Sequence, residues 1–255
     1  MTEASVPCSQ TLCTMSKHIE RFTIPSYLAD GDRMLSPNSL LSVTQELGLV
    51  GAEELGCGET EMARHGVAWV YSRIRFTVLR YPVLGEKLVM ETWHNGQNGP
   101  FFIRNYRLLS EDGTLLVKAS SSSVVLDTAT RTVKRVEQLE MDLSPQDTET
   151  VYDEPAGKVM MPRGVEPDAV YTRRVEYCDT DFVGHTNNTN YLRWALDLEC
   201  RCEDALKHPS DVSLCFMHEA RLGDEIQYRR YVLGDERFYA GFVGDKQVIA
   251  IHMYR

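Results

Sequence analysis

The segment EYCDTDFVGHTNNTNYLRW, from Glu176 to Trp194, gathers two aspartates, a histidine and several asparagines around an expected helix start. Asp181 and His185 stand four residues apart among small and polar residues. A carboxylate and an imidazole at one reacting centre can activate water, or attack directly, and shuttle the proton. We therefore expect Asp181 and His185 to be catalytic, and Asp179 to be a structural carboxylate that caps or ends a strand.

Asn187 and Asn188 fall where the helix should begin. An asparagine there can simply be an N-cap, worth about 1 kcal/mol of stability. A helix start also offers unpaired backbone N–H groups and a positive dipole end, which can hold the oxyanion formed when a carbonyl is attacked. The residues alone leave both roles open.

Glu219 lies in FMHEARLGDEI, at the end of an apolar strand and just before a glycine turn. It is either a solvated charge at a sheet edge or a second carboxylate that orients or deprotonates water. If a bent sheet returns this strand beside the helix start, Glu219 joins Asp181 and His185.

The first half of the chain predicts one helix followed by an antiparallel meander. From Ser36 the sequence shows a capping serine, a proline at the first helical position and apolar residues at helical spacing. Strand-like segments separated by turn signals follow at Val67–Leu79, Lys87–Trp93, Phe101–Leu109 and Leu115–Leu126.

The second half repeats this order, with a strand near Tyr171–Tyr177, a helix over about Thr189–Leu206 and four further strands. LGEKL at Leu84–Leu88 also matches LGDEI at Leu222–Ile226, so an internal duplication is the economical explanation. A helix wrapped by a bent antiparallel sheet is the hotdog fold, and we predict an α+β tandem (double) hotdog. The expected parts are an N-terminal extension (1–18), a first hotdog (19–135), an acidic linker (136–168) and a second hotdog (169–255).

Only the second half carries the full polar set. Asp32 stands opposite Asp181, but the first half has no histidine at the place of His185. We expect catalysis in the second half and a pocket wall in the first. The candidate pocket-lining residues, each of which could equally be ordinary core, are Leu40, Leu47, Trp69 and Tyr71.

The formal charge of −10 argues against a nucleic-acid partner, because phosphate binding requires a basic face. Nine acidic and two basic residues fall between Glu137 and Asp168, so the rest of the chain is nearly neutral. A local basic cluster could still attract an acidic partner, although scattered solvated arginines are the simpler interpretation; its candidate members are Arg73, Arg75, Arg80, Arg104, Arg107, Lys134 and Arg135.

The seven cysteines are scattered without zinc-type spacing, so we expect reduced thiols, no metal and no cofactor. No apolar run approaches the roughly 20 residues of a membrane span, and the N-terminus is unlike a signal peptide. A cytoplasmic, bacterial protein is the expectation.

The motif DTDFVGHTNNTNYLRW resembles the active-site motif of the acyl-carrier-protein thioesterases, in which Asp is followed by Asn two residues on, His two further, and a pair of asparagines. RYPVLGEKLVMETW, NGPFFIRNY, KASSSSVVLDTATR and HEARLGDEI resemble other stretches of that family. The resemblance implies a double hotdog that hydrolyses fatty acyl thioesters of acyl carrier protein. It implies catalytic roles for Asp181, His185 and Glu219, with Asn187 in the oxyanion or orienting shell.

Two positions depart from that family. Val183 replaces its usual asparagine and cannot form a hydrogen bond through its side chain, which predicts a rate lower by about a hundredfold. Plant members have a cysteine where this chain has Ala220, so a thiol nucleophile there is excluded. We favour attack by water activated by carboxylate and histidine.

Other functions stay open at this point. Hotdog thioesterases that act on coenzyme A esters share the aspartate and the NYLRW-like helix start. Acyl hydratases and dehydratases also use histidine with a carboxylate, but their motif places Asp five residues before His, not four. A non-catalytic protein that senses acyl thioesters needs an effector module, for which the first 18 residues are too few. A homodimer is also possible, although a tandem copy can make the usual pairing of hotdog sheets internal.

Overall fold

One continuous antiparallel sheet forms the body of the molecule in the computed structural model, which describes residues 17–135, 138–139, 141 and 143–255. Along the sheet the strands run in the order β1-β3-β4-β5-β2-β8-β11-β10-β9-β7, and β6 pairs with β5. The strands of the first half are β1 (His18–Thr23), β2 (Val67–Val78), β3 (Lys87–Asn98), β4 (Phe101–Ser110), β5 (Leu115–Asp127) and β6 (Val133–Lys134). Those of the second half are β7 (Ala169–Arg174), β8 (Asp211–Phe216), β9 (Glu225–Leu233), β10 (Glu236–Val243) and β11 (Lys246–Tyr254).

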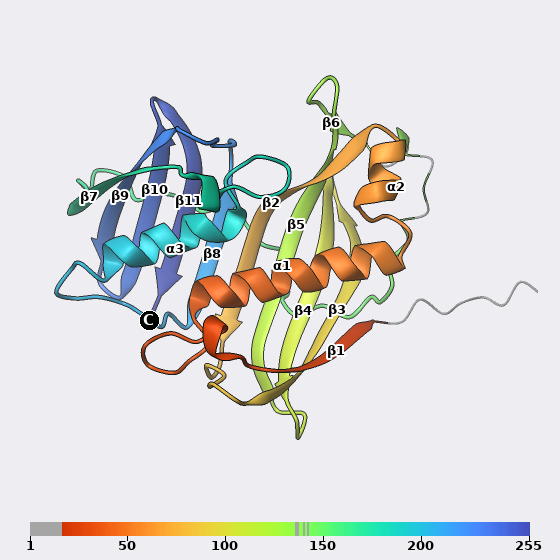
Figure 1. Cartoon of the computed structure of the whole chain (residues 1–255), viewed down its shortest axis with the longest axis horizontal. Helices are drawn as coiled ribbons and strands as arrows, with labels where there is room; N and C mark the ends of the chain where they lie inside the picture. The colour runs from red at the N-terminus through yellow and green to blue at the C-terminus, as the bar shows by residue number, and fades with distance from the viewer. Residues whose placement is uncertain (1–16, 136–137, 140, 142) are drawn as a thin grey trace, which may run out of the picture.

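The two halves join through β2 and β8, which pair antiparallel from Arg73 opposite Cys215 to Thr77 opposite Asp211. The helices α1 (Pro37–Glu54) and α3 (Asn188–Glu199) lie on the same face of the sheet and contact each other (Figure 1). The tandem copy therefore makes the sheet-to-sheet pairing within one chain, as expected for an α+β double hotdog.

Both helices begin at the residues that the sequence indicated. The Ser36 side chain caps α1 by accepting a hydrogen bond from the Ser39 amide at 3.3 Å, and Pro37 occupies the first turn. The buried stripe of α1 includes Leu40, Leu41 and Leu47. The apolar spacing of the sequence therefore placed the core-facing side of this helix correctly.

The second helix is shorter than predicted, since α3 ends at Glu199 and not near Leu206. The Glu199 carboxylate accepts a hydrogen bond from the Leu206 amide at 2.7 Å, which holds the following loop against the helix end. Cys202 and Ala205, which fall within the predicted helix, lie in that loop. Neither β1 nor the short helix α2 (Glu59–Arg64) was predicted from the sequence.

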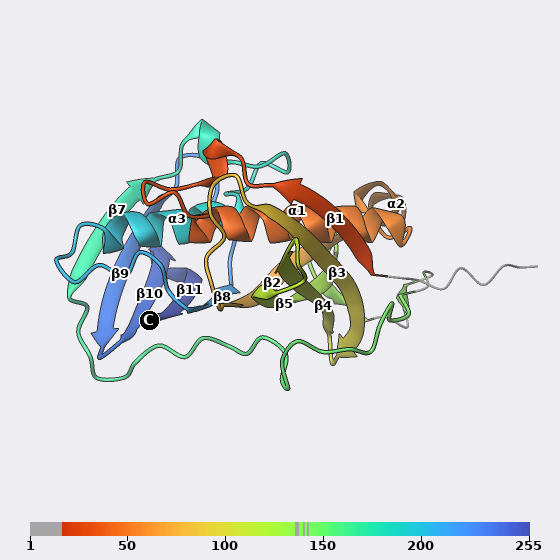
Figure 2. The same cartoon turned by 90° about the horizontal axis from the view of Figure 1, so that it is seen from below.

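The acidic connection between the halves runs along the face of the sheet opposite the helices (Figure 2). Its described residues are tied down at several points. Tyr152 shares a 2.9 Å hydrogen bond with Thr77, the Trp93 indole donates to the Glu149 carbonyl at 2.8 Å, and the Val159 amide lies 3.1 Å from the Cys215 sulfur. The segment from 143 to 168 thus covers the outer face although it forms no regular element.

In the described part of the chain, no helix combines the length and the apolar character needed to cross a membrane. The predicted extension over residues 1–18 falls almost entirely outside the described residues, and β1 already begins at His18.

Candidate active site

The loop from Asp181 to His185 holds the Asp181 carboxylate in a fixed position. One carboxylate oxygen, Oδ1, accepts hydrogen bonds from the amides of Val183 at 3.0 Å and His185 at 3.1 Å. The Asp181 amide in turn donates to the His185 carbonyl at 2.8 Å. Gly184 closes the turn at φ +85°, a left-handed conformation that glycine adopts without strain. Among the described residues no group donates to the second oxygen of Asp181, so it can accept a hydrogen bond from a substrate or a water.

His185 and Glu219 come together from different elements. Glu219 Oε2 lies 3.1 Å from His185 Nε2. Backbone contacts hold the two segments together. The Thr186 amide donates to the Ala220 carbonyl at 2.8 Å, and His185 and Arg221 form an antiparallel β-bridge through their backbones. The return of this strand beside the helix start therefore places Glu219 where it can orient the imidazole.

Two arginines flank Glu219. Arg131, from the first half, forms an ion pair with Glu219 Oε1, and Arg221 lies 3.7 Å from Oε2. Arg131 adopts φ +59° in the turn between β5 and β6, which projects it toward the second half. Arg131 was not among the site residues predicted from the sequence. The only sequence feature that could have indicated it is its position as the last residue of KASSSSVVLDTATR, one of the stretches that resemble the thioesterase family.

Asn187 is the N-cap of α3. Its Oδ1 accepts hydrogen bonds from the Thr189 amide at 3.0 Å and the Thr189 hydroxyl at 2.9 Å. Among the described residues, no group accepts from its Nδ2, so that amide can donate to a ligand. The capping role and a role in binding an oxyanion are thus compatible.

Asp179 is buried and serves the architecture. Its carboxylate pairs with Arg193 at 2.6 Å and Arg173 at 3.4 Å, and it accepts a hydrogen bond from the Glu176 amide at 2.9 Å. These contacts fix the short 3-10 helix η3 (Tyr177–Asp179), which leads into the Asp181 loop.

A pocket of about 500 Å³ lies between α1 and the sheet of the first half and reaches the second-half motif. Asp181 and Asn187 line it, together with Phe182, Val183 and Asn188, whereas His185 and Glu219 do not. Of the pocket residues suggested by the sequence, Trp69 and Tyr71 are lining residues. Leu40 and Leu47 are not among them and belong to the buried core.

The space beneath α3 is filled instead. Tyr191 and Trp194 are buried against the sheet, and the Trp194 ring contacts that of Tyr228 edge-on at 6.3 Å between centroids. Glu199 is completely buried and ion-paired with Arg230, which holds the pKa of Glu199 below its ordinary value despite desolvation. Large side chains and a buried charge network thus occupy the position that is hollow under α1.

The first half contains a copy of the loop from Asp181 to His185. Asp30 Oδ1 accepts hydrogen bonds from the Asp32 amide at 3.0 Å and the Met34 amide at 3.1 Å, the same pattern that Asp181 shows. The bridges Ala29–Leu35 and Thr180–Thr186 fix the correspondence. The prediction that Asp32 stands opposite Asp181 was therefore wrong, because Asp30 does.

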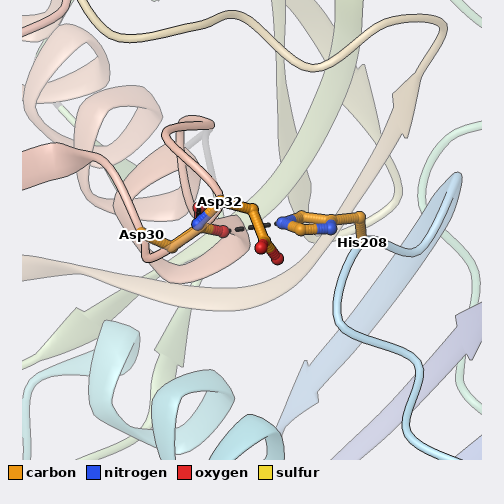
Figure 3. Close-up of side chains that lie close together, drawn as sticks. All are labelled: Asp30, Asp32 and His208. Atoms are coloured by element: carbon orange, nitrogen blue, oxygen red, sulfur yellow. Dashed lines mark hydrogen bonds and ion pairs between the residues drawn. The ribbon is translucent and has the colours of Figure 1, made fainter.

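The copied loop has no imidazole at the place of His185. Met34 takes the place of His185, and the Asp30 carboxylate bonds to His208 of the second half at 2.6 Å (Figure 3). Asp30, Asp32 and His208 offer ligand-type atoms within 4.8 Å of one another, but none of them lines the pocket. This cluster ties the two halves together on the side away from the motif.

The predicted basic cluster is largely neutralised by the chain's own acids. Arg75 pairs with Asp211 at 2.9 Å, and Arg107 pairs with Glu149. Arg80 pairs with Glu86, and Lys134 lies 3.2 Å from Asp127. Arg104 differs, because it lines the pocket.

The fold is that of a double-hotdog protein, and its two units differ. The second unit carries the polar motif, and the first unit forms most of the pocket. Among the described cysteines, Cys215 lies on the outer face and Cys57 lines the pocket, and burial raises the pKa of both thiols, which disfavours the nucleophilic thiolate. Ala220 is fully buried.

The comparison with protein families identifies the group to which the chain belongs. The family model of the acyl-ACP thioesterase N-terminal domain matches residues 15–141, and that of the C-terminal domain matches residues 165–241. The chain is a member of the acyl-ACP thioesterase family.

Curated relatives are plant proteins. The chain is 26% identical over 228 residues to a chloroplastic dodecanoyl-[acyl-carrier-protein] hydrolase of Cinnamomum camphora, in a match that covers 84% of this chain and 59% of the relative. It is 24% identical to oleoyl-acyl carrier protein thioesterase 1 of Arabidopsis thaliana, over 70% of this chain and 53% of the relative. The chain thus spans about half the length of these relatives.

Solved structures share the fold. An acyl-ACP thioesterase from Bacteroides thetaiotaomicron matches with a TM-score of 0.76 at 20% identity, over 93% of this chain and 97% of that one. The 12:0-ACP thioesterase from Umbellularia californica matches with a TM-score of 0.79 at 21% identity, over 93% and 96%. The predicted α+β double hotdog is thereby confirmed.

Proposed function

We propose that this protein hydrolyses fatty acyl thioesters of acyl carrier protein, releasing the free fatty acid and the carrier thiol. The observation that carries the proposal is the meeting of pocket and motif: Asp181 and Asn187 line the cavity under α1. Membership of the acyl-ACP thioesterase family supports the same reaction.

In this proposal the acyl chain enters the first-half pocket and the thioester carbonyl lies at the start of α3. The Nδ2 of Asn187 and the positive end of the helix stabilise the oxyanion that forms on attack. The remaining oxygen of Asp181 holds the attacking water, since its partner oxygen is already bound by two amides.

His185 is the proton carrier. Glu219 orients the imidazole and stabilises its cationic form, as a carboxylate next to a catalytic histidine does. Water loses a proton to the site as its oxygen bonds to the carbonyl carbon. When the C–S bond breaks, that proton passes to the sulfur and the carrier leaves as a thiol.

The test is hydrolysis of a panel of acyl carrier protein thioesters, with matched coenzyme A esters, by the wild type, Asp181→Ala and His185→Ala. The copied loop provides a matched control, because Met34→Ala changes the equivalent position in the first half. We expect each catalytic substitution to lower kcat by more than about a hundredfold and the control to have little effect.

The panel also separates the alternatives. Preference for the coenzyme A esters would assign the protein to the acyl-CoA thioesterases of the hotdog class. Tight binding of acyl carrier protein without hydrolysis of either ester would contradict the proposal and indicate a non-catalytic binding protein.

A further inference from the structure

The pocket contains more polar groups than an unmodified hydrocarbon chain requires. Arg104, Tyr71, Tyr106 and Ser121 line its sheet side alongside the apolar Trp69. These side chains come from β2, β4 and β5, which are neighbours in the sheet. Arg104 lies directly opposite Ser121 in the β4–β5 pair. These groups share the helix-facing side of the sheet in the half that forms the pocket.

Arg104 has no carboxylate partner among the described residues. In that part of the chain its guanidinium makes a single hydrogen bond, from Nη1 to the Thr92 hydroxyl at 3.4 Å, which is at the long limit for such a bond. Arg107, on the same strand, is paired with Glu91 and Glu149. A partly buried cation without a counter-ion is costly, so the unpaired state of Arg104 points to a ligand that completes it.

The groups around Arg104 do not supply the missing negative charge. Tyr71 and Tyr106 share a hydrogen bond at 2.8 Å, and Tyr106 lies 3.2 Å from the Ser121 hydroxyl. Burial raises the pKa of Tyr71, which keeps its hydroxyl neutral. In the part of the chain that the structure describes, two carboxylates line the pocket, but Glu46 is exposed and Asp181 belongs to the proposed catalytic loop. Neither lies within ion-pair distance of Arg104.

Helix α1 is shaped to admit these polar groups. A Cβ added at Gly51 would lie 2.7 Å from the Arg104 Nη1, and one at Gly48 would lie 2.8 Å from the Tyr106 hydroxyl. A glycine inside a helix costs about 1 kcal/mol relative to alanine. Two glycines on the face above Arg104 and Tyr106 therefore keep space that an alanine would close.

We propose that the acyl group accepted by this pocket carries a carboxylate on its chain, and that Arg104 binds this group. The inference rests on the proposed thioesterase function and specifies its substrate class: thioesters of dicarboxylic acids with one end free. A guanidinium suits this ligand because it forms paired, charge-assisted hydrogen bonds to a carboxylate. The linked hydroxyls of Tyr71, Tyr106 and Ser121 use two of their three hydrogens on one another, which leaves one to donate to the ligand.

The experiment compares carrier-protein thioesters that are matched in chain length and differ only in the far end: methyl, hydroxyl or carboxylate. A series of lengths is needed to bring the end group to Arg104. We expect the carboxylate series to exceed the methyl series in kcat/KM by at least about tenfold at its best length, with the hydroxyl series between them.

Arg104→Met tests the assignment of the residue. This change should lower kcat/KM for the best carboxylate substrate by about a hundredfold and leave the methyl series unchanged or improved. Arg104→Lys should retain part of the preference because it keeps the charge. Arg163→Met, at an exposed arginine away from the pocket, controls for the change in net charge. Thermal unfolding of each variant shows whether it is folded.

The outcomes distinguish the two proposals. Hydrolysis that favours the methyl series at every length, with a ratio unaltered by Arg104→Met, would overturn the role of Arg104 and leave the thioesterase function standing. Absence of hydrolysis for every substrate would contradict the function. Calorimetry with the methyl ester of a monocarboxylic acid and the half methyl ester of a dicarboxylic acid of equal length then still tests the pocket, and equal affinity for both would reject the inference.

Discussion

Glu219 Oε2 lies 3.1 Å from His185 Nε2, and the other oxygen of Glu219 is held by Arg131 of the opposite half. The imidazole is thus supported by a carboxylate that is itself anchored across the junction of the two hotdog units. Asp181, by contrast, is fixed by backbone amides of its own loop. The two acidic residues therefore have different surroundings: Glu219 contacts His185, and Asp181 lines the pocket.

Glu219→Gln should lower kcat by at least about a hundredfold while KM changes by less than about threefold. The amide keeps the size of the side chain but no longer stabilises a cationic imidazole. Steady-state kinetics on an acyl-carrier-protein thioester measures both constants. Glu225→Gln, at an exposed position on β9, is the matched control and should leave both unchanged. A Glu219→Gln variant as fast as the wild type would remove Glu219 from the mechanism.

Val183→Asn should raise kcat by about tenfold or more, because it supplies an orienting polar group at the mouth of the pocket. The valine side chain is exposed and lines the pocket, so the substitution requires no repacking. Single-turnover kinetics separates the chemical step from product release. A rate equal to that of the wild type would show that another group, such as Asn187, already performs this task.

The sequence allowed the helix starts and most strands to be predicted because their signals are local. Ser36 and Pro37 mark a helix start within a few residues, and the turn glycines separate the strands. The end of α3 was misplaced because it depends on Glu199, whose partners Arg230 and Tyr239 come from distant strands. No local pattern reveals such a buried network.

The candidate site likewise contains residues that a local sequence pattern reveals and residues that it does not. Asp181, His185 and Asn187 could be proposed from one contiguous motif, whereas Arg131 could not, because it approaches through a turn of the other half. The sequence also did not reveal that the space between helix and sheet is hollow under α1 and filled under α3. This difference depends on whether large side chains such as Trp194 fill the space, and an apolar stripe alone does not determine this.

Because the space is hollow under α1 and filled under α3, an Ala→Leu substitution on each helix should have a different effect. Ala52 lies on α1 and lines the pocket, while Ala195 lies on α3 and is completely buried in packed core. Ala52→Leu should leave the free energy of unfolding nearly unchanged and shift activity toward shorter acyl chains. Ala195→Leu should destabilise the protein by about 1–3 kcal/mol through overpacking. Urea unfolding and a chain-length panel test both, and equal destabilisation would argue against a hollow first half.

His94 predicts a loss of stability in mild acid. Burial, together with the nearby Arg104 guanidinium, lowers its pKa to about 4, although carbonyls of Leu143 and Ile103 at 3.0 and 3.1 Å favour protonation. The unfolded chain takes up this proton near its ordinary pKa of 6.5, whereas the folded protein does not until the pH is much lower. The stability is therefore complete above about pH 6.5 and decreases as the pH falls toward 4, by up to about 3 kcal/mol.

Urea unfolding at about pH 7 and pH 5 measures this change above the range in which carboxylates take up protons. His94→Gln should reduce the pH dependence over that interval. Arg104→Met should also reduce it, because removal of the neighbouring cation lets His94 accept its proton at a higher pH. If the wild type and both variants show the same slope, His94 is not the group responsible, and Arg104 is not close enough to affect it.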